Sequence, residues 1–300
     1  MINRGMRFGS IAATVVGLVL TLAGAGAAHA SVPVDAGENE GIKYTALGDS
    51  RASGPRLEPM YPDGCSRSYE NFAGKISREL AVEEFADVSC SAARSENIIS
   101  TPQLIPTQWP VQLDAVHPDT NLITLSVGGN DSNTLIVGAL CASPAPGVDR
   151  GCRNDPLTES LAQSGIDQAA DSLDKTLAAL TARAPQARIY MVGAGGMIGA
   201  RACWPNVPFS DGDAAWFMNY YARFNTQFAA IAGRYGVHVI DIATDAVAGG
   251  HDACAAPEQR WFEGMFSEST AQRLHFTASG MTEVADRIVA DLRANPIGVA

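Results

Sequence analysis

Short apolar runs alternate along this chain with longer segments of helical spacing. In residues 157–183, apolar side chains recur every three or four positions, and Pro185 follows, so this segment predicts a helix. The run LITLSV at residues 122–127 is rich in β-branched residues and is closed by two glycines, which predicts a strand. By the same reasoning we expect further strands at 43–47, 85–89, 188–192 and 237–240, and further helices at 71–80, 214–235 and from about 277 past 292.

The expected strands are continuously apolar rather than alternating in and out. Strands of this kind, separated by helices, are typical of a parallel sheet that helices cover on both faces. The sequence therefore predicts an α/β domain. Irregular stretches are expected at 51–68, 141–156, 196–213 and 244–274, and no domain boundary is visible among them.

The first thirty residues have the features of a secretory signal. Arg4 and Arg7 precede a short apolar segment. Ala28-His29-Ala30 then has small residues at the two positions that a signal peptidase recognises. The alternative is a short membrane anchor. We expect residues 1–30 to be a signal peptide, 31–41 a flexible leader and 42–296 one domain. The protein would be secreted or stay at the cell envelope, with no stable membrane insertion once the signal is removed.

Charge and cysteine content narrow the classes of function. A formal charge of −11 and a pI near 4.8 argue against nucleic acid as a partner. Six cysteines in an exported chain predict three disulfides, and 15 pairings are possible from sequence alone. No pair of cysteines or histidines has the spacing of a zinc site, so we expect neither a metal nor a cofactor.

Candidate chemistry stands directly after three of the expected strands. Gly48-Asp49-Ser50 follows the first, Cys90-Ser91-Ala92 the second, and Gly128-Gly129-Asn130-Asp131 the third. Reactive groups of open parallel sheets gather beyond the carboxyl ends of the strands. His275, just before the last expected helix, is the candidate general base, because a neutral imidazole can accept a serine proton near neutral pH.

In this order, Gly48-Asp49-Ser50, Gly-x-Asn130-Asp131 and a late His275 resemble the SGNH (GDSL) hydrolase family, and the exported six-cysteine form resembles lipases and esterases of actinobacteria. The resemblance covers about residues 42–294. It implies a flavodoxin-like three-layer α/β/α fold around a central parallel sheet, and hydrolysis of esters. It also implies the pairs Cys65–Cys90, Cys141–Cys152 and Cys203–Cys254.

Carried over position by position, the resemblance makes Ser50 the nucleophile and His275 the base. The N–H groups of Ser50 and Ala92 and the carboxamide of Asn130 would form the oxyanion hole. Asp49 and Asp131 are interpreted as loop-holding residues. Alanine at 92, where the family commonly has glycine, is expected to be tolerated if its φ is negative.

Two further positions depart from the family pattern. The family usually has Asp three residues before the histidine, where this chain has Gln272. We expect an oxygen of Gln272 to orient the His275 ring, with a distant acid, Glu268 or Asp252, as the alternative. Arg51, directly after Ser50, is expected either to bind an acidic substrate group or an oxyanion, or to point away and pair with Asp49 or Glu58.

Three functions remain open at this point. The first is a secreted carboxylic-ester hydrolase, lipase- or esterase-like, that works through an acyl-serine intermediate on a lipid or small-molecule ester. The second is an acyltransferase or carbohydrate deacetylase of the same fold. The third is a non-catalytic exported binding protein on the same scaffold, which the departures at Gln272, Ala92 and Arg51 motivate. We expect the protein to be a monomer.

Overall fold

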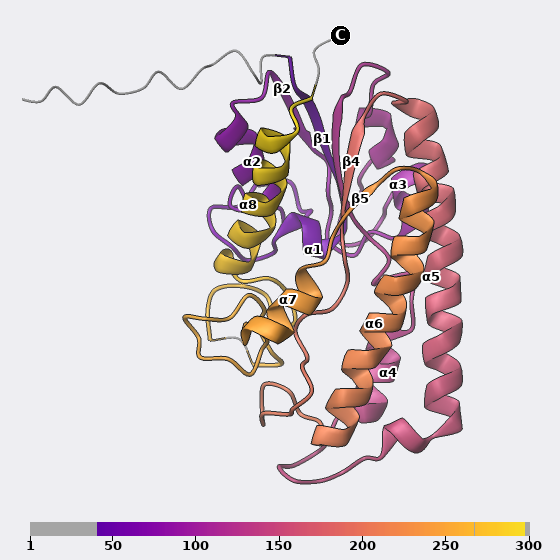
Figure 1. Cartoon of the computed structure of the whole chain (residues 1–300), viewed down its shortest axis with the longest axis vertical. Coiled ribbons are helices and arrows are strands. Elements are labelled where there is room, and N and C mark those ends of the chain that lie inside the picture. Colours follow the sequence, from indigo (N-terminus) through magenta and orange to yellow (C-terminus); the bar gives the residue numbers. More distant parts are fainter. Residues whose placement is uncertain (1–40, 267, 298–300) are drawn as a thin grey trace, which may run out of the picture. The chain divides into compact units, whose positions relative to one another are not determined.

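The computed structural model describes residues 41–266 and 268–297 (Figure 1). The expected signal and all but the last residue of the expected leader lie outside the described residues. The described residues belong to one compact unit. Among them, no helix has the length and apolar character needed to cross a membrane.

The centre of the fold is a sheet of five parallel strands in the order β2-β1-β3-β4-β5. Strand β3 is buried along its whole length, as its continuous apolar run predicted. The strands are β1 (Lys43–Gly48), β2 (Glu84–Asp87), β3 (Leu122–Ser126), β4 (Arg188–Val192) and β5 (His238–Ile240). All five expected strands are therefore present, and none of their ends differs from the expected position by more than two residues.

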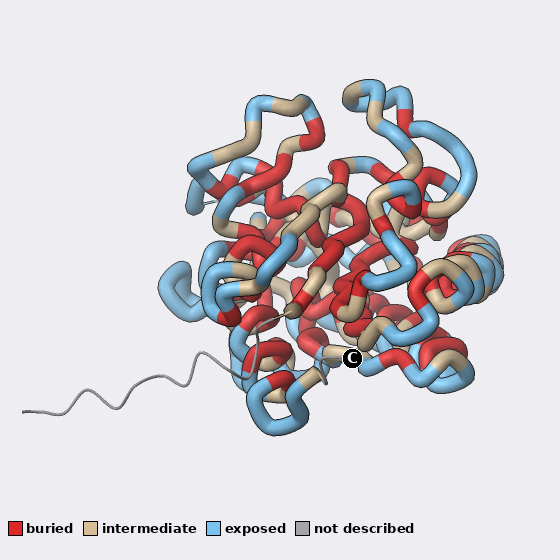
Figure 2. The backbone as a smooth tube through the Cα atoms, turned by 90° about the horizontal axis from the view of Figure 1, so that it is seen from above, coloured by how far each residue is buried: buried red, intermediate tan, exposed pale blue. Residues whose placement is uncertain are grey.

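Helices cover both faces of this sheet, which gives the three layers expected of the fold. Helices α2 (Phe72–Leu80) and α8 (Ala278–Ala294) pack together on one side, and α5 (Pro156–Arg183) and α6 (Asp211–Arg234) on the other (Figure 1). Seen from above, the buried residues gather in the interior of this unit and the exposed ones lie at its periphery (Figure 2).

Four helices were not predicted from the sequence. They are α1 (Ser50–Ser53), α3 (Ser95–Ile99), α4 (Thr134–Cys141) and α7 (Ile242–Gly249). The expectation of an irregular stretch over 244–274 is wrong at its start, because α7 occupies it. Asp241 caps this helix by accepting a hydrogen bond from the Thr244 N–H, and Gly250 ends it in a left-handed conformation.

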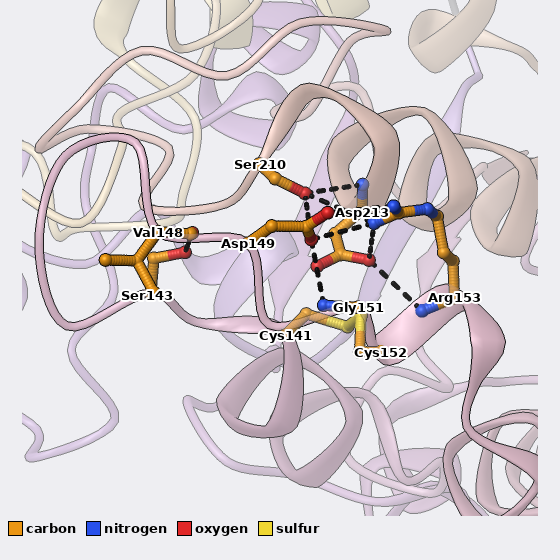
Figure 3. Close-up of polar contacts among 9 residues, drawn as sticks. All are labelled: Cys141, Ser143, Val148, Asp149, Gly151, Cys152, Arg153, Ser210 and Asp213. Atoms are coloured by element: carbon orange, nitrogen blue, oxygen red, sulfur yellow. Dashed lines mark hydrogen bonds and ion pairs between the residues drawn. A yellow bond between two sulfur atoms is a disulfide. The ribbon is translucent and has the colours of Figure 1, made fainter.

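Three disulfides connect the loops, and they are the pairs that the resemblance implied: Cys65–Cys90, Cys141–Cys152 and Cys203–Cys254. The loop closed by Cys141–Cys152 is also fixed to the start of α6 (Figure 3). Arg153 binds both oxygens of Asp149 at 2.8 Å, and its Nη1 lies 2.9 Å from the Oδ1 atom of Asp213, whose side chain is fully buried. A disulfide and an ion-pair network therefore hold the same loop.

Candidate active site

The turn after β1 fixes the position of Ser50. Gly48 has φ of 144°, and a side chain there would place its Cβ 2.3 Å from the carbonyl oxygen of Ser126, so only glycine fits. Asp49 then caps α1, since its Oδ1 atom accepts a hydrogen bond of 2.9 Å from the Arg51 N–H. This is the loop-holding role expected of Asp49, and it places Ser50 at the first position of the helix.

The structure brings Ser50 and His275 together. The Nε2 atom of His275 lies 2.6 Å from the Oγ atom of Ser50, although 225 positions separate them in the chain. Burial is the main cause that lowers the pKa of His275 below its ordinary value of 6.5, and the nearby charge of Arg51 lowers it further, while the hydrogen bond to the Arg273 carbonyl opposes them. The imidazole is therefore neutral at neutral pH and able to accept a proton.

The group that orients His275 differs from the expectation. The Nδ1 atom lies 2.8 Å from the carbonyl oxygen of Arg273, and not beside an oxygen of Gln272. The Gln272 carbonyl instead accepts the backbone N–H of His275 at 3.2 Å, and Leu274 between them has φ of 62°. This left-handed turn directs the ring toward Arg273. A backbone carbonyl leaves no signal in the sequence, so the identity of the residue was not predictable.

The distant-acid alternative is also wrong. The Oε2 atom of Glu268 lies 3.3 Å from Arg260, and the Oδ1 atom of Asp252 accepts the N–H of Cys254 at 2.8 Å. In the part of the chain that the structure describes, no carboxylate forms a hydrogen bond or an ion pair with the His275 ring. His251, also in the C-terminal part of the chain, stacks on Trp261 with ring centroids 4.1 Å apart.

The expected oxyanion residues follow the strands on either side of β1. Ala92 comes after β2 and Asn130 after β3, and both strands pair with β1 in parallel, so the three strand ends share one edge of the sheet. The Nδ2 atom of Asn130 donates to the carbonyl of Ala93 at 2.9 Å, which leaves its second hydrogen available. The backbone N–H groups of Ser50 and Ala92 have no acceptor among the described residues.

Two expectations about this edge have different outcomes. Asp131 accepts hydrogen bonds from the N–H and the hydroxyl of Ser95, so it ties the Asn130 loop to α3 and holds the loop as expected. Ala92, by contrast, has φ of 68°, so the condition of a negative φ is not met. Alanine occupies a left-handed conformation where glycine would be unstrained.

Arg51 takes neither of the ion pairs considered for it. Its Nη2 atom donates to the carbonyl of Gly193, just after β4, at 3.0 Å, and its guanidinium lies over the rings of Phe276 and Phe262. The Nε and Nη1 atoms are shielded from solvent. The expectation of pairing with Asp49 or Glu58 is therefore wrong, and contact with a substrate stays a prediction.

No group of three or more His, Cys, Asp or Glu side chains that could hold a metal occurs within residues 41–266 and 268–297. The chemistry that this arrangement supports uses a hydroxyl, an imidazole and hydrogen-bond donors. In such a set, the imidazole activates the hydroxyl as a nucleophile, and the donors stabilise the negative charge that develops when it attacks a carbonyl carbon.

Comparisons with known proteins agree on one family. The profile of the GDSL-like lipase/acylhydrolase family matches residues 46–282. Lipase 2 of Streptomyces coelicolor is 31% identical over 254 residues, which cover 82% of this chain and 84% of that protein. A lipase of Streptomyces rimosus is 26% identical over 192 residues, 63% of this chain and 65% of that protein.

Solved structures of low sequence identity share the fold. The crystal structure of an extracellular lipase from Streptomyces rimosus superposes with a TM-score of 0.67 at 22% identity, covering 83% of this chain and 98% of that chain. A phospholipase A1 from Streptomyces albidoflavus gives a TM-score of 0.66 at 20% identity, covering 84% and 98%.

Proposed function

Because this chain belongs to the GDSL-like lipase/acylhydrolase family and is an ester hydrolase, we propose that Ser50 and His275 carry out hydrolysis of carboxylic esters of lipids as a catalytic dyad. The observation that carries the proposal is the distance of 2.6 Å between the Ser50 Oγ and His275 Nε2 atoms. A nucleophile and its base must lie within hydrogen-bond reach of each other.

The tautomer of His275 follows from its two contacts. A carbonyl oxygen can only accept, so the Nδ1 atom next to the Arg273 carbonyl carries the proton. The Nε2 atom then presents its lone pair to the Ser50 hydroxyl. The backbone carbonyl thus performs one of the two tasks of a triad carboxylate, fixing the tautomer and the ring. It does not supply the negative charge that stabilises an imidazolium.

The proposed reaction has two steps. In the first, His275 takes the Ser50 proton while Oγ forms a bond to the ester carbonyl carbon. The protonated imidazole then donates to the departing alcohol as the carbon–oxygen bond breaks, which leaves an acyl-serine. In the second step, His275 takes a proton from water, the hydroxide oxygen attacks the acyl carbon, and the proton returns to Ser50 as the carboxylic acid leaves.

The proposed oxyanion hole consists of the N–H groups of Ser50 and Ala92 and the amide of Asn130. Support comes from their place on three adjacent strand ends and from the free donors described above. Loss of one such donor costs about 10²- to 10³-fold in kcat. We therefore expect Asn130→Ala to lower kcat by about that factor in a protein that still folds, with only a small loss of thermal stability from the missing hydrogen bond to Ala93.

The proposed substrate is a lipid ester, which the named activities of the Streptomyces relatives support. A chain-length series of p-nitrophenyl esters, measured on wild type and on Ser50→Ala, tests this function. Wild type should hydrolyse medium and long acyl chains, and Ser50→Ala should lose at least about 10³-fold in kcat. Activity on acetyl esters of glycans alone would favour a deacetylase, and no activity in a folded protein would favour a binding protein.

The proposed location is the exterior of the cell or its envelope. The three disulfides support this, because such bonds persist in oxidising compartments. The extracellular lipase of similar fold is consistent with it. Edman sequencing of the protein recovered from culture medium should begin at Ser31 if residues 1–30 are removed on export, and a mature protein that begins at Met1 would contradict this.

A further inference from the structure

Arg51 connects three segments that meet at the proposed active site. Its guanidinium carbon lies 4.5 Å from the ring centroid of Phe276 and 5.4 Å from that of Phe262. Its Nη2 atom donates to the carbonyl of Gly193 at 3.0 Å. The Arg51 side chain therefore contacts three separate segments. They are Phe276 directly after His275, Phe262 on the segment that pairs with Phe276, and Gly193 directly after β4.

The contacts of Arg51 run beside those of the proposed catalytic pair. Ser50 meets His275 through a hydrogen bond, and the next residue on each side, Arg51 and Phe276, meet through a cation–π contact. Phe276 is buried and packs on Phe262 with ring centroids 4.6 Å apart, in a short antiparallel pairing of the two segments. Displacing the His275 segment from Ser50 would therefore break the contact of Arg51 with Phe276 as well.

The charge of Arg51 is not neutralised by a hydrogen-bonded carboxylate. Its Nε and Nη1 atoms are buried and have no hydrogen-bond partner among the described residues. Asp49, whose charge acts on Arg51, accepts the backbone N–H of Arg51 rather than its guanidinium, and burial raises the pKa of Asp49 to about 7. Unpaired buried donors are costly to a fold, so stability alone does not account for this arginine.

We propose that Arg51 is a positioning residue, which holds the His275 segment against Ser50 through its contacts with Phe276, Phe262 and the carbonyl of Gly193. This inference rests on the proposed function. The other titratable groups that face the guanidinium are Asp49, from the turn after β1, and Tyr221, from α6. Burial raises the pKa of Tyr221 well above 10, so the tyrosine stays neutral and does not compensate the charge.

The electrostatic consequence can be measured as a pH profile. Burial first, and the Arg51 charge after it, lower the pKa of His275 below 6.5. Because the base must be neutral to act, the acid limb of kcat/KM should lie below pH 6.5. Removing the charge should raise the pKa of His275 and move this limb to higher pH.

The test measures p-nitrophenyl butyrate hydrolysis by Arg51→Met, Arg51→Lys and Phe276→Leu from pH 4.5 to 8.5. Arg51→Met should lower kcat by at least about 10-fold with KM within about 3-fold, and shift the acid limb upward. Arg51→Lys should keep the acid limb of wild type while losing part of kcat. Phe276→Leu should lower kcat without raising the limb. Arg56→Met, an exposed arginine five positions on, is the matched control and should behave as wild type.

Several outcomes would overturn the proposal. An Arg51→Met variant with kcat within 2-fold of wild type and an unmoved acid limb would do so. A lower kcat without any movement of the limb would refute the electrostatic role, and a selective rise in KM for anionic esters would indicate direct substrate contact instead. If Arg51→Met does not fold, the other two variants still test the proposal. Arg51→Lys should keep the acid limb of wild type, and Phe276→Leu should have a lower kcat than wild type.

Parallel measurements on Ser50→Ala and His275→Ala separate the two proposals. If these variants retain wild-type activity, the proposed function fails, whatever Arg51 does. If they abolish activity while Arg51→Met equals wild type, only the inference about Arg51 fails.

Discussion

The Nδ1 atom of His275 lies 2.8 Å from the carbonyl oxygen of Arg273, two residues before it in the chain. The His275 ring is therefore oriented by the backbone, and the side chain of Gln272 has no hydrogen bond to it. We predict that Gln272→Ala changes kcat/KM by less than about 3-fold, since the carbonyl remains in place. Steady-state kinetics on a soluble ester check this. A loss of 100-fold or more in a folded variant would show that Gln272 orients the base after all.

The conformation of Ala92 leads to a prediction about stability. Its φ of 68° strains an alanine, and glycine adopts this conformation freely. Ala92→Gly should therefore raise the free energy of unfolding by up to ~1 kcal/mol, the relief of strain being partly offset by the greater freedom of glycine in the unfolded chain.

Urea denaturation measures the effect of Ala92→Gly. The matched control is Ala93→Gly, because Ala93 is buried and is not among the residues with positive φ, so this change should destabilise. Equal destabilisation by both changes would contradict the argument from strain.

Burial of Asp49 makes stability depend on pH. Its pKa is raised from 3.8 to about 7 chiefly by loss of solvent, with the N–H of Arg51 and the Arg51 charge opposing this shift. The folded state thus binds the proton more tightly than the unfolded state does. The stability that this group contributes is complete below pH 3.8 and is lost as the pH rises through 7.

We predict that Asp49→Asn loses less free energy of unfolding between pH 5 and pH 8 than wild type does, since asparagine keeps the acceptor for the Arg51 N–H but cannot ionise. Denaturant titrations at the two pH values measure this. The control is Asp114→Asn, an exposed carboxyl group that should leave the pH dependence unchanged. The same pH dependence in wild type and Asp49→Asn would refute the assignment.

The network around Arg153 predicts a large loss of stability on mutation. Asp213 has a fully buried side chain, and its Oδ1 atom accepts both the backbone N–H and the Nη1 of Arg153 (Figure 3). Arg153→Ala would leave this carboxylate without its cation, which should cost about 3 kcal/mol.

The matched control for this change is Arg234→Ala. The ion pair of Arg234 with Asp174 is exposed, so its loss should cost no more than about 1 kcal/mol. Thermal and urea denaturation of both variants compare the two pairs directly. Equal losses of unfolding free energy in the two variants would mean that the burial of Asp213 does not make its ion pair more important for stability than an exposed pair.

The sequence was sufficient for the sheet and for the order of the candidate site residues. Most of the strands are short apolar runs, and Ser50, Ala92 and Asn130 stand within a few residues after three of them, so topology alone brings them to one edge. Short helices such as α4 were missed because their eight residues lie between loop-forming stretches and show little amphipathic periodicity.

The finer geometry of the candidate site could not be predicted for a different reason. The choice of the Arg273 carbonyl depends on the left-handed backbone of Leu274, a conformation that leucine rarely adopts and that its identity does not encode. The place of the Arg51 guanidinium depends on Phe262 and Phe276, which are distant from it in the chain. Such features arise from tertiary packing.

The account depends most on Ser50 being a nucleophile that His275 activates. Labelling of the native protein with a fluorophosphonate, followed by mass spectrometry of the modified peptide, tests this directly. We predict that the probe modifies wild type at Ser50 alone, and that His275→Ala reacts at least about 10³-fold more slowly. A correctly folded wild-type protein that stays unlabelled, or that is modified at another residue, would contradict the account.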